Sequence, residues 1–244
     1  MQRYFTKTKI NPITVIDDAP IIHHVFHVMR MKPGDDFDVC TMDKQCFRMK
    51  ILSLDEKAIE CEKQYAVAYT PHPLNIKLAQ SLIRKEKFEL VIQKASELGA
   101  KTLMPLMTSR TIVKIHENAL DKKLTRFKKI AKEAAEQTKR NTIMDIDAPT
   151  EINTIDFKAY DKVLVAYEAE PRTTTKTIIK ALQPGMDVLI LIGPEGGFSD
   201  VEIDYLKSQG ALSIALGPRI LRSETAAFYI LAAISYELEM SVEL

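Results

Sequence analysis

Apolar and polar residues alternate in short runs over the first 70 residues, which is the pattern of half-buried β-strands. Turn-forming residues separate these runs at 33–35 and 54–56, and a more helical stretch at 23–30 interrupts them. The proline-rich segment Thr-Pro-His-Pro at 70–73 then marks an expected domain boundary. We therefore expect residues 1–70 to form a small, mostly β domain. The expected strands cover residues 13–16, 37–40, 45–52 and 59–65.

From residue 71 the pattern changes to apolar runs that alternate with stretches of helical periodicity. Runs that are apolar on both faces are typical of buried parallel strands, and the stretches between them suit crossover helices. We therefore expect residues 71–244 to form an α/β domain with a mostly parallel sheet. The expected strands are 74–82, 102–107, 163–167, 188–192 and 212–216, and the expected helices include 88–98, 120–134, 176–182, 201–209 and 227–238.

Charge is distributed unevenly along the second domain. Residues 84–140 hold 15 lysines and arginines against 7 aspartates and glutamates, whereas residues 141–244 hold 8 against 16. The expected helix 120–134 is the most basic, and its lysines and arginine fall largely off its apolar stripe. A basic segment can attract a polyanion even when the net charge of the chain is only +1. The alternative is a set of solvated helix faces.

The amino-acid composition limits the classes of protein to which this chain can belong. A hydrophobic content of 46% with 27% charged residues is ordinary for a soluble globular protein. No apolar run approaches the ~20 residues needed to span a bilayer, and the N-terminus does not resemble a signal peptide. The cysteines Cys40, Cys46 and Cys61 are odd in number and form no CxxC pair. We therefore expect no disulfide framework, no zinc site and a location in the reducing cytoplasm.

Two Gly-Pro turns near the C-terminus are the strongest indication of a binding site. One at 193–197 follows the expected strand 188–192, and the other at 217–218 follows strand 212–216. Ser199 and Glu202 form a capping-box pattern that marks the start of the next helix. Ligands of α/β sheets bind at the carboxyl ends of strands, so these turns are expected to be two walls of one pocket. Taken alone, each turn would more often be a simple connection.

The first turn is not a phosphate-binding loop. It lacks the G-K-[ST] of a Walker loop, and G-P-E-G-G does not match the dinucleotide fingerprint G-x-G-x-x-G. Pro194 also removes a backbone N–H that a phosphate cradle would use. Glycines that permit close approach, stiffened by prolines, suit a flat and largely uncharged ligand such as an adenine ring. Main-chain groups at 192–193 and 216–221 are expected to bind it.

The two turns belong to longer motifs, LIGPEGGFS at 191–199 and LGPRILRSETAA at 216–227. Together they resemble the signature of the RsmE family of SPOUT-class methyltransferases, which act on N3 of a uridine in 16S rRNA. Shorter segments also match the family's pattern. They are KASELG at 94–99, EAAEQ at 133–137, Arg3-Tyr4-Phe5, His23-His24 and Arg30, with Tyr167-Glu168 where the family usually has His-Glu.

The resemblance implies a fold and a set of partners. It implies a PUA-like RNA-binding β-barrel over residues 1–70, followed by a SPOUT methyltransferase domain over 71–244 whose mostly parallel α/β fold contains a trefoil knot. The cofactor would be S-adenosyl-L-methionine, and the partner 16S rRNA in the small ribosomal subunit. A homodimer, a role in ribosome biogenesis and a cytoplasmic location are also implied, with no metal and no membrane.

The resemblance also assigns candidate site residues. Arg222 is a candidate for stabilising the anion of uracil or contacting phosphate, and Glu195 is a candidate base or hydrogen-bond acceptor. Structural alternatives are an Arg222–Glu224 ion pair and a helix cap by Glu195. Candidates for cofactor binding are Tyr167, Glu168, Leu191, Ile192, Gly193, Pro194, Gly196, Gly197, Leu216, Gly217, Ile220, Leu221 and Thr225. Candidates for RNA binding are Arg3, His23, Arg30, Lys85, Lys94, Arg110 and Arg140.

Three functions remain open on the sequence. The first is uridine-N3 methylation of 16S rRNA. The second keeps the fold but transfers the methyl group to another acceptor, a ribose 2′-OH or guanine N1. The third is a non-catalytic RNA-binding module in ribosome assembly, against which the intact Gly-Pro motifs argue.

Overall fold

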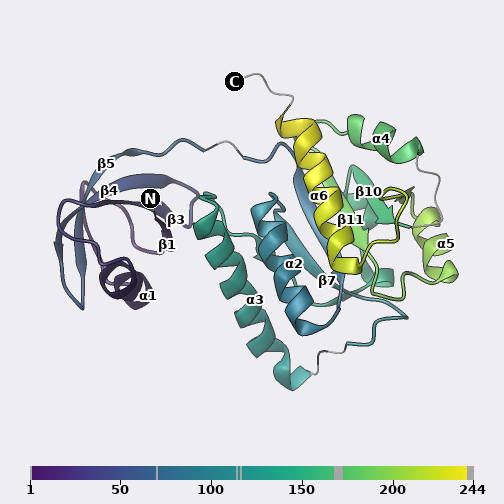
Figure 1. Cartoon of the computed structure of the whole chain (residues 1–244), viewed down its shortest axis with the longest axis horizontal. Coiled ribbons are helices and arrows are strands. Elements are labelled where there is room, and N and C mark those ends of the chain that lie inside the picture. Colours follow the sequence, from purple (N-terminus) through teal and green to yellow (C-terminus); the bar gives the residue numbers. More distant parts are fainter. Residues whose placement is uncertain (1, 70, 114, 116, 168–172, 241–244) are drawn as a thin grey trace. The chain divides into compact units, whose positions relative to one another are not determined.

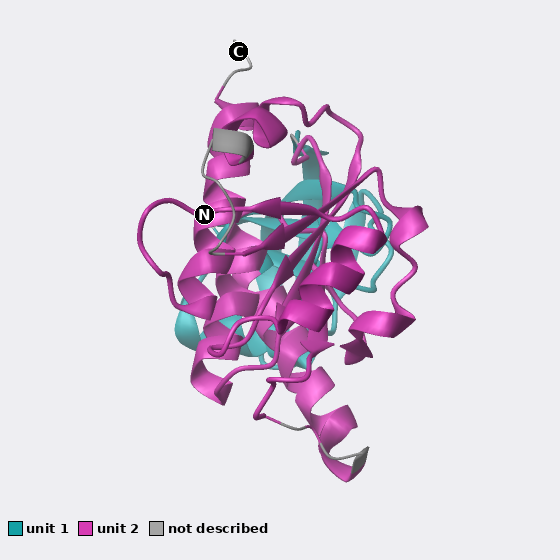
Figure 2. Cartoon of the chain, turned by 90° about the vertical axis from the view of Figure 1, so that its right-hand side faces the viewer, with its two compact units in different colours: residues 1–70, 135–143 teal, residues 71–134, 144–244 magenta. Residues whose placement is uncertain are grey.

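The computed structural model describes residues 2–69, 71–113, 115, 117–167 and 173–240. Two compact units are distinguished in Figure 2. The first consists of residues 1–70 and 135–143, and the second of residues 71–134 and 144–244. The boundary near residue 70 lies at the Thr-Pro-His-Pro segment 70–73. The segment 135–143, which sequence analysis assigned to the second domain, packs with the N-terminal strands instead.

The first unit is built on a curled five-stranded sheet in the order β1-β3-β4-β5-β2 (Figure 1). β1 pairs in parallel with β3, and the remaining neighbours are antiparallel. Alternate side chains point inward, as expected for strands with one buried face. The inward-pointing Phe37, Val39 and Met49 are fully buried. The strands are β1 (Arg3–Thr6), β2 (Ile13–Ile16), β3 (Asp36–Thr41), β4 (Cys46–Leu54) and β5 (Ile59–Ala66).

One helical segment packs against this sheet. Asp18 caps helix α1 (Ala19–His23) by accepting a hydrogen bond from the backbone N–H of Ile21. The helix then continues as a π-helical turn, η1 (His24–Val28). Helical structure was predicted at 23–30, but it begins earlier and its π geometry was not anticipated. The apolar side of the segment buries Ile21, Ile22 and Val25 in the core of the unit.

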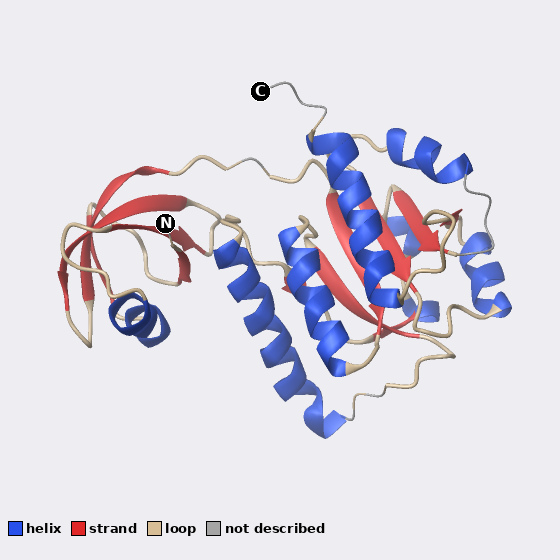
Figure 3. Ribbon diagram, viewed as in Figure 1, coloured by secondary structure: helices blue, strands red, loops and turns tan. Residues whose placement is uncertain are grey.

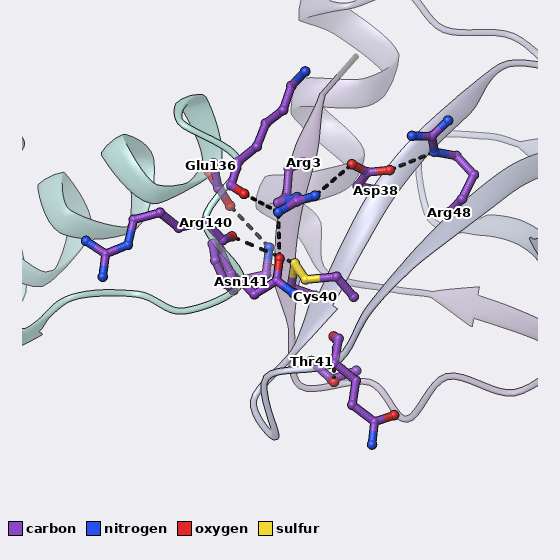
Figure 4. Close-up of a disulfide and its surroundings, with 12 residues drawn as sticks. Arg3, Asp38, Cys40, Thr41, Arg48, Glu136, Arg140 and Asn141 are labelled. Carbon is purple, nitrogen blue, oxygen red and sulfur yellow. Dashed lines mark hydrogen bonds and ion pairs between the residues drawn. A yellow bond between two sulfur atoms is a disulfide. The ribbon is translucent and has the colours of Figure 1, made fainter. Parts of the chain in front are cut away.

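Arg3 is at the centre of a buried ionic cluster between β1, β3 and the segment 135–143 (Figure 4). Its guanidinium contacts Asp38 at 3.0 Å and Asn141 Oδ1 at 2.7 Å, and it also donates to the carbonyl oxygen of Lys139. Arg48 donates to the other oxygen of Asp38 at 2.7 Å. Arg3 and Asp38 are each 3% exposed, so these hydrogen bonds are needed to offset the cost of burying the two charges.

The structure corrects the expectation that the cysteines form no disulfide. Cys40 and Cys46 are bonded to each other across the β3–β4 hairpin, also drawn in Figure 4. The two residues face each other directly in the strand register, with their Cα atoms 4.0 Å apart. The register of a hairpin is not visible in cysteine spacing, which is why the pairing was missed. Cys61 is free, and burial raises the pKa of its thiol to about 12.

The second unit contains a seven-stranded sheet whose described pairs are all parallel, in the order β12-β10-β11-β6-β7-β8, with β9 also pairing with β7. This confirms the predicted α/β class. The strands are β6 (Asn75–Ser81), β7 (Thr102–Met107), β8 (Asp145–Ile146), β9 (Thr150–Glu151), β10 (Lys162–Ala166), β11 (Asp187–Ile192) and β12 (Leu212–Ile214). The helices are α2 (Lys85–Glu97), α3 (Glu117–Gln137), α4 (Thr173–Lys180), α5 (Asp200–Ser208) and α6 (Ser223–Glu239), with short 3-10 turns η2 (Ile152–Thr154) and η3 (Phe157–Ala159).

Both faces of this sheet are covered. Helices α2 and α6 lie side by side across one face (Figure 3). On the other face, Ile203 and Leu206 of α5 pack with Leu189 and Leu191 of β11. Because β11 is buried on both sides, its sequence is apolar at five consecutive positions. Within the described residues, no helix is long and apolar enough to cross a membrane.

Candidate functional site

A cleft of about 440 Å³ opens at the carboxyl ends of β10, β11 and β12. The two Gly-Pro loops form opposite parts of its wall, as the sequence predicted, and the first residues of α6 complete it. This volume falls within the range of roughly 300–1,000 Å³ that is usual for small-molecule sites. The lining residues are Ala166, Tyr167, Ile192, Gly193, Pro194, Glu195, Gly196, Gly197, Leu216, Gly217, Pro218, Arg219, Ile220, Leu221, Arg222, Ser223 and Ala226.

The first loop folds back on itself immediately after β11. Gly197 adopts a φ of +66° and donates its N–H to the carbonyl oxygen of Pro194 at 2.9 Å. A Cβ added to Gly193 would lie 3.2 Å from the backbone carbon of Gly197 and 3.2 Å from the Phe198 ring. Both glycines are therefore required by the backbone path, one for its φ angle and the other for close packing.

The loop ends at a well-formed helix cap. The Ser199 hydroxyl accepts from the N–H of Glu202, and the Glu202 carboxylate accepts from the N–H of Ser199 at 2.8 Å, so the predicted capping box is present. Glu202 also accepts from the N–H of Ser109 at 2.7 Å. Burial acts to raise the pKa of Glu202, but the hydrogen bonds from Ser109 and Ser199 outweigh it and lower that pKa.

The second loop is tied to the first by one side chain. Ser223, the first residue of α6, donates its hydroxyl to the carbonyl oxygen of Gly193 at 2.5 Å. The same hydroxyl accepts from Nε2 of Gln80 at 2.8 Å, and Gln80 is fully buried at the end of β6. This chain of hydrogen bonds fixes the relative position of the two walls of the cleft.

Comparison with known proteins decides the family. The profile of an RNA methyltransferase domain matches residues 70–235, and the profile of an RNA methyltransferase PUA domain matches residues 16–64. The chain belongs to this family of RNA methyltransferases. Among its curated relatives, ribosomal RNA small subunit methyltransferase E of Bacillus subtilis is 34% identical, and the match covers 98% of each chain. The protein of that name from Mesomycoplasma hyopneumoniae is 32% identical over 95% of this chain and 97% of its own. The RsmE resemblance is thereby confirmed.

Solved structures of family members share the fold. A Legionella pneumophila protein, described as a methyltransferase in complex with its cofactor SAM, superposes with a TM-score of 0.83 and 30% identity, over 96% of each chain. Ribosomal RNA small subunit methyltransferase E of Neisseria gonorrhoeae, bound to S-adenosylmethionine, gives a TM-score of 0.82 at 24% identity, over 96% of this chain and 97% of its own. The predicted SPOUT-class α/β architecture with a PUA-like N-terminal domain agrees with these neighbours.

Most of the candidate cofactor-binding residues line the cleft, but three of them do not or cannot be placed there. Leu191 is fully buried in the core behind the cleft, and Thr225 is exposed on α6 without lining it. Glu168 lies outside the described residues. Ser223 was not singled out from the sequence, although it lies inside the second motif and has the short hydroxyl side chain that often bonds to backbone groups.

Glu195 and Arg222 are both exposed at the cleft. Glu195 does not cap the following helix, and Arg222 does not form an ion pair with Glu224. The cap of α5 is supplied by Ser199 rather than Glu195. The Glu224 carboxylate pairs with Lys87 at 2.9 Å, and Arg222 makes no ion pair in the part of the chain that is described. Burial acts to raise the pKa of Glu224, but Lys87 and, more weakly, Arg222 act against it and the pKa is lowered.

The candidate RNA-binding residues separate into buried and exposed groups. Arg3 and Arg140 are 3% and 8% exposed, so burial does not fit surface contacts with RNA for either side chain. Lys94 is paired with Glu97 on its own helix at 2.7 Å. Arg110 is exposed and donates to the carbonyl oxygens of Gly196 and Phe198. His23, Arg30 and Lys85 are exposed.

The histidine pair of the N-terminal unit is divided between surface and interior. His24 Nδ1 is 2.8 Å from the hydroxyl of Tyr4, whereas His23 faces solvent beside the ring of His27. Among the described residues there is no group of three or more potential ligands arranged to hold a metal ion.

Proposed function

We propose that this protein is an S-adenosyl-L-methionine-dependent methyltransferase that modifies N3 of one uridine in 16S rRNA. The observation that carries the proposal is the cleft formed by the two Gly-Pro loops at the carboxyl ends of parallel strands. It is supported by the relatives named for methylation of small-subunit ribosomal RNA and by the neighbour solved with SAM.

The cleft suits this cofactor chemically. Ile192, Leu216, Leu221 and Ala226 supply apolar surface for an adenine ring, and the glycines allow the backbone to approach it closely. Tyr167 stands at the end of β10 on the same cleft. When bound, the cofactor supplies a methyl group on a sulfonium, so the task of the protein is mainly to position the acceptor.

The acceptor requires help from charged residues. Uridine N3 carries a proton and is a poor nucleophile until that proton is lost. Arg222 is exposed beside the cleft and would stabilise the uracil anion as it forms. Glu195, exposed on the opposite loop, would accept the N3 proton or a hydrogen bond from the base.

RNA binding is assigned to exposed cations in each unit. His23 and Arg30 contribute from the first unit and Lys85 from the second. Exposed lysines of α3, including Lys122 and Lys128, would add electrostatic affinity that falls as salt rises. Specificity would come from a target base that leaves its stack and is read along its edge.

Four finer properties complete the proposal: a homodimer, a trefoil knot around the cleft, a role in ribosome biogenesis and a cytoplasmic location. Tyr229 and Tyr236 on α6, and Met240 just after it, are exposed and offer apolar surface for a second copy. The cytoplasm is where ribosomal subunits are assembled, which fits the proposed substrate.

The test uses the full chain, S-adenosylmethionine carrying a labelled methyl group, and small subunits from cells that lack the modification. Label should enter 16S rRNA, and calorimetry should detect cofactor binding without RNA. Cofactor binding without label transfer would favour a non-catalytic assembly module. Absence of both would exclude the enzyme.

A further inference from the structure

The turn at residues 108–111, which follows β7, lies against the first Gly-Pro loop at 193–199. One Nη of Arg110 in this turn donates to the carbonyl oxygen of Gly196 at 2.8 Å and to that of Phe198 at 3.1 Å. These carbonyls flank Gly197, the residue with positive φ. A single guanidinium nitrogen therefore holds the two backbone oxygens that define the bend of the loop.

The aliphatic part of the same side chain covers the loop. A Cβ built on Gly196 would be 3.7 Å from both Cβ and Cδ of Arg110, which is ordinary van der Waals contact. Gly196 lines the cleft and is itself exposed. Arg110 therefore packs against the back of a residue whose other side forms the binding wall.

The 108–111 turn is itself held in a defined shape. Thr111 donates its N–H to the carbonyl oxygen of Thr108, and the Thr111 hydroxyl accepts from the N–H of Thr108 at 3.0 Å. Ser109 adds a second connection, because its N–H donates to Glu202 in the cap of α5. The turn thus contacts the cleft loop at its middle and at its end.

We propose that Arg110 is a positioning residue, which holds the 193–199 loop in its binding shape before the cofactor arrives. This role differs from the RNA contact expected from the sequence, and it rests on the proposed function only for the identity of the ligand. Preorganisation of this kind improves affinity because the loop does not lose conformational freedom when the ligand binds.

The experiment compares Arg110→Ala and Arg110→Lys with the matched control Arg126→Ala, which removes an exposed arginine of the same unit that pairs with Glu89. In Arg110→Ala, the Kd and KM for S-adenosylmethionine should rise about tenfold. The KM for RNA should stay within about twofold, and Arg110→Lys should be intermediate because lysine lacks the planar fork. The control should leave the cofactor Kd unchanged.

A second measurement does not depend on the ligand. Amide hydrogen exchange at 195–198 in the cofactor-free protein should be several-fold faster in Arg110→Ala than in the wild type or the control. Unchanged exchange, or an increase in the KM for RNA alone, would overturn the positioning role. If the wild type bound no S-adenosylmethionine, the proposed function would fail while the exchange result would still decide the role of Arg110.

Discussion

Ser223 donates a hydrogen bond of 2.5 Å to the carbonyl oxygen of Gly193, across thirty positions of sequence. The donor is the first residue of the last helix, and the acceptor is the first residue after β11. Gln80 supports the same hydroxyl from the fully buried end of β6. One serine side chain thus connects the start of α6 to the first Gly-Pro loop and to β6.

Replacement of this serine should loosen the cleft. Ser223→Ala removes the bridge and leaves the Gln80 amide with one partner fewer, so the free energy of unfolding should fall by about 1–2 kcal/mol. The Kd for S-adenosylmethionine should rise about five- to tenfold by calorimetry. Ser223→Thr, which keeps the hydroxyl, should lose much less, and Thr225→Ala, on the exposed side of α6, should change neither quantity. A Ser223→Ala protein with wild-type cofactor affinity would show that the bridge is incidental.

A methyl group on Gly193 should distort the first loop. Gly193→Ala places a Cβ 3.2 Å from the backbone of Gly197, so the loop must shift and cofactor affinity should fall more than tenfold. Gly210→Ala is the matched control. Gly210 has a φ of +86° and open space around its Cβ position, so this variant should lose about 1 kcal/mol of stability and no affinity. Urea denaturation and calorimetry on both variants separate backbone strain from loop displacement. Equal cofactor affinity in the two would count against the loop as a wall of the site.

Arg222 should matter for turnover more than for cofactor binding. If it stabilises the uracil anion, Arg222→Ala should lower kcat by about 10²–10³ while the Kd for S-adenosylmethionine stays within twofold. Arg222→Lys keeps the positive charge but lacks the planar guanidinium fork, so its kcat should lie between those of the wild type and Arg222→Ala. Single-turnover methylation and calorimetry provide the two readouts. An equal loss of turnover and of cofactor affinity would indicate a structural role.

Glu202 should make the protein sensitive to acid. Its pKa in the folded state lies below the ordinary value of 4.5, so it contributes stability above that value, and this contribution is lost as the pH falls through the folded pKa. Urea midpoints measured between pH 6 and pH 3 should therefore fall more steeply for the wild type than for Glu202→Gln. Parallel slopes in the two proteins would mean that Glu202 has no pH-dependent role.

The N-terminal unit should depend on its buried carboxylate. Asp38→Ala leaves the Arg3 guanidinium buried without its counter-charge and should cost about 3–5 kcal/mol of stability. Arg48→Ala removes the more exposed partner and should cost clearly less. Chemical denaturation followed by far-UV circular dichroism measures both. The two variants would lose equal stability only if burial of the ion pair were unimportant.

Local patterns predicted the fold well where residues act through their neighbours in sequence. The apolar run of β11 and the Ser199–Glu202 cap require nothing from distant parts of the chain, and both were found as expected. The position of the cleft followed from the rule that ligands bind at the carboxyl ends of parallel strands.

Long-range pairings were not predictable in this way. Arg3 reads as a surface cation near the N-terminus, but its partners Asp38 and Asn141 lie 35 and 138 positions away. Arg110 is similarly separated from Gly196 by 86 positions. The charge of an arginine is visible in sequence, whereas the carbonyls and carboxylates that it meets are determined only by the folded chain.

The central claim is tested most directly by the chemical identity of the methylated nucleoside. Small subunits that lack the modification are incubated with the protein and S-adenosylmethionine, and the 16S rRNA is digested to nucleosides for mass spectrometry. Our account predicts 3-methyluridine at a single site, absent when Arg222→Ala replaces the wild type in a single-turnover reaction of equal length. Methyl groups on a ribose or on guanine N1 would contradict it.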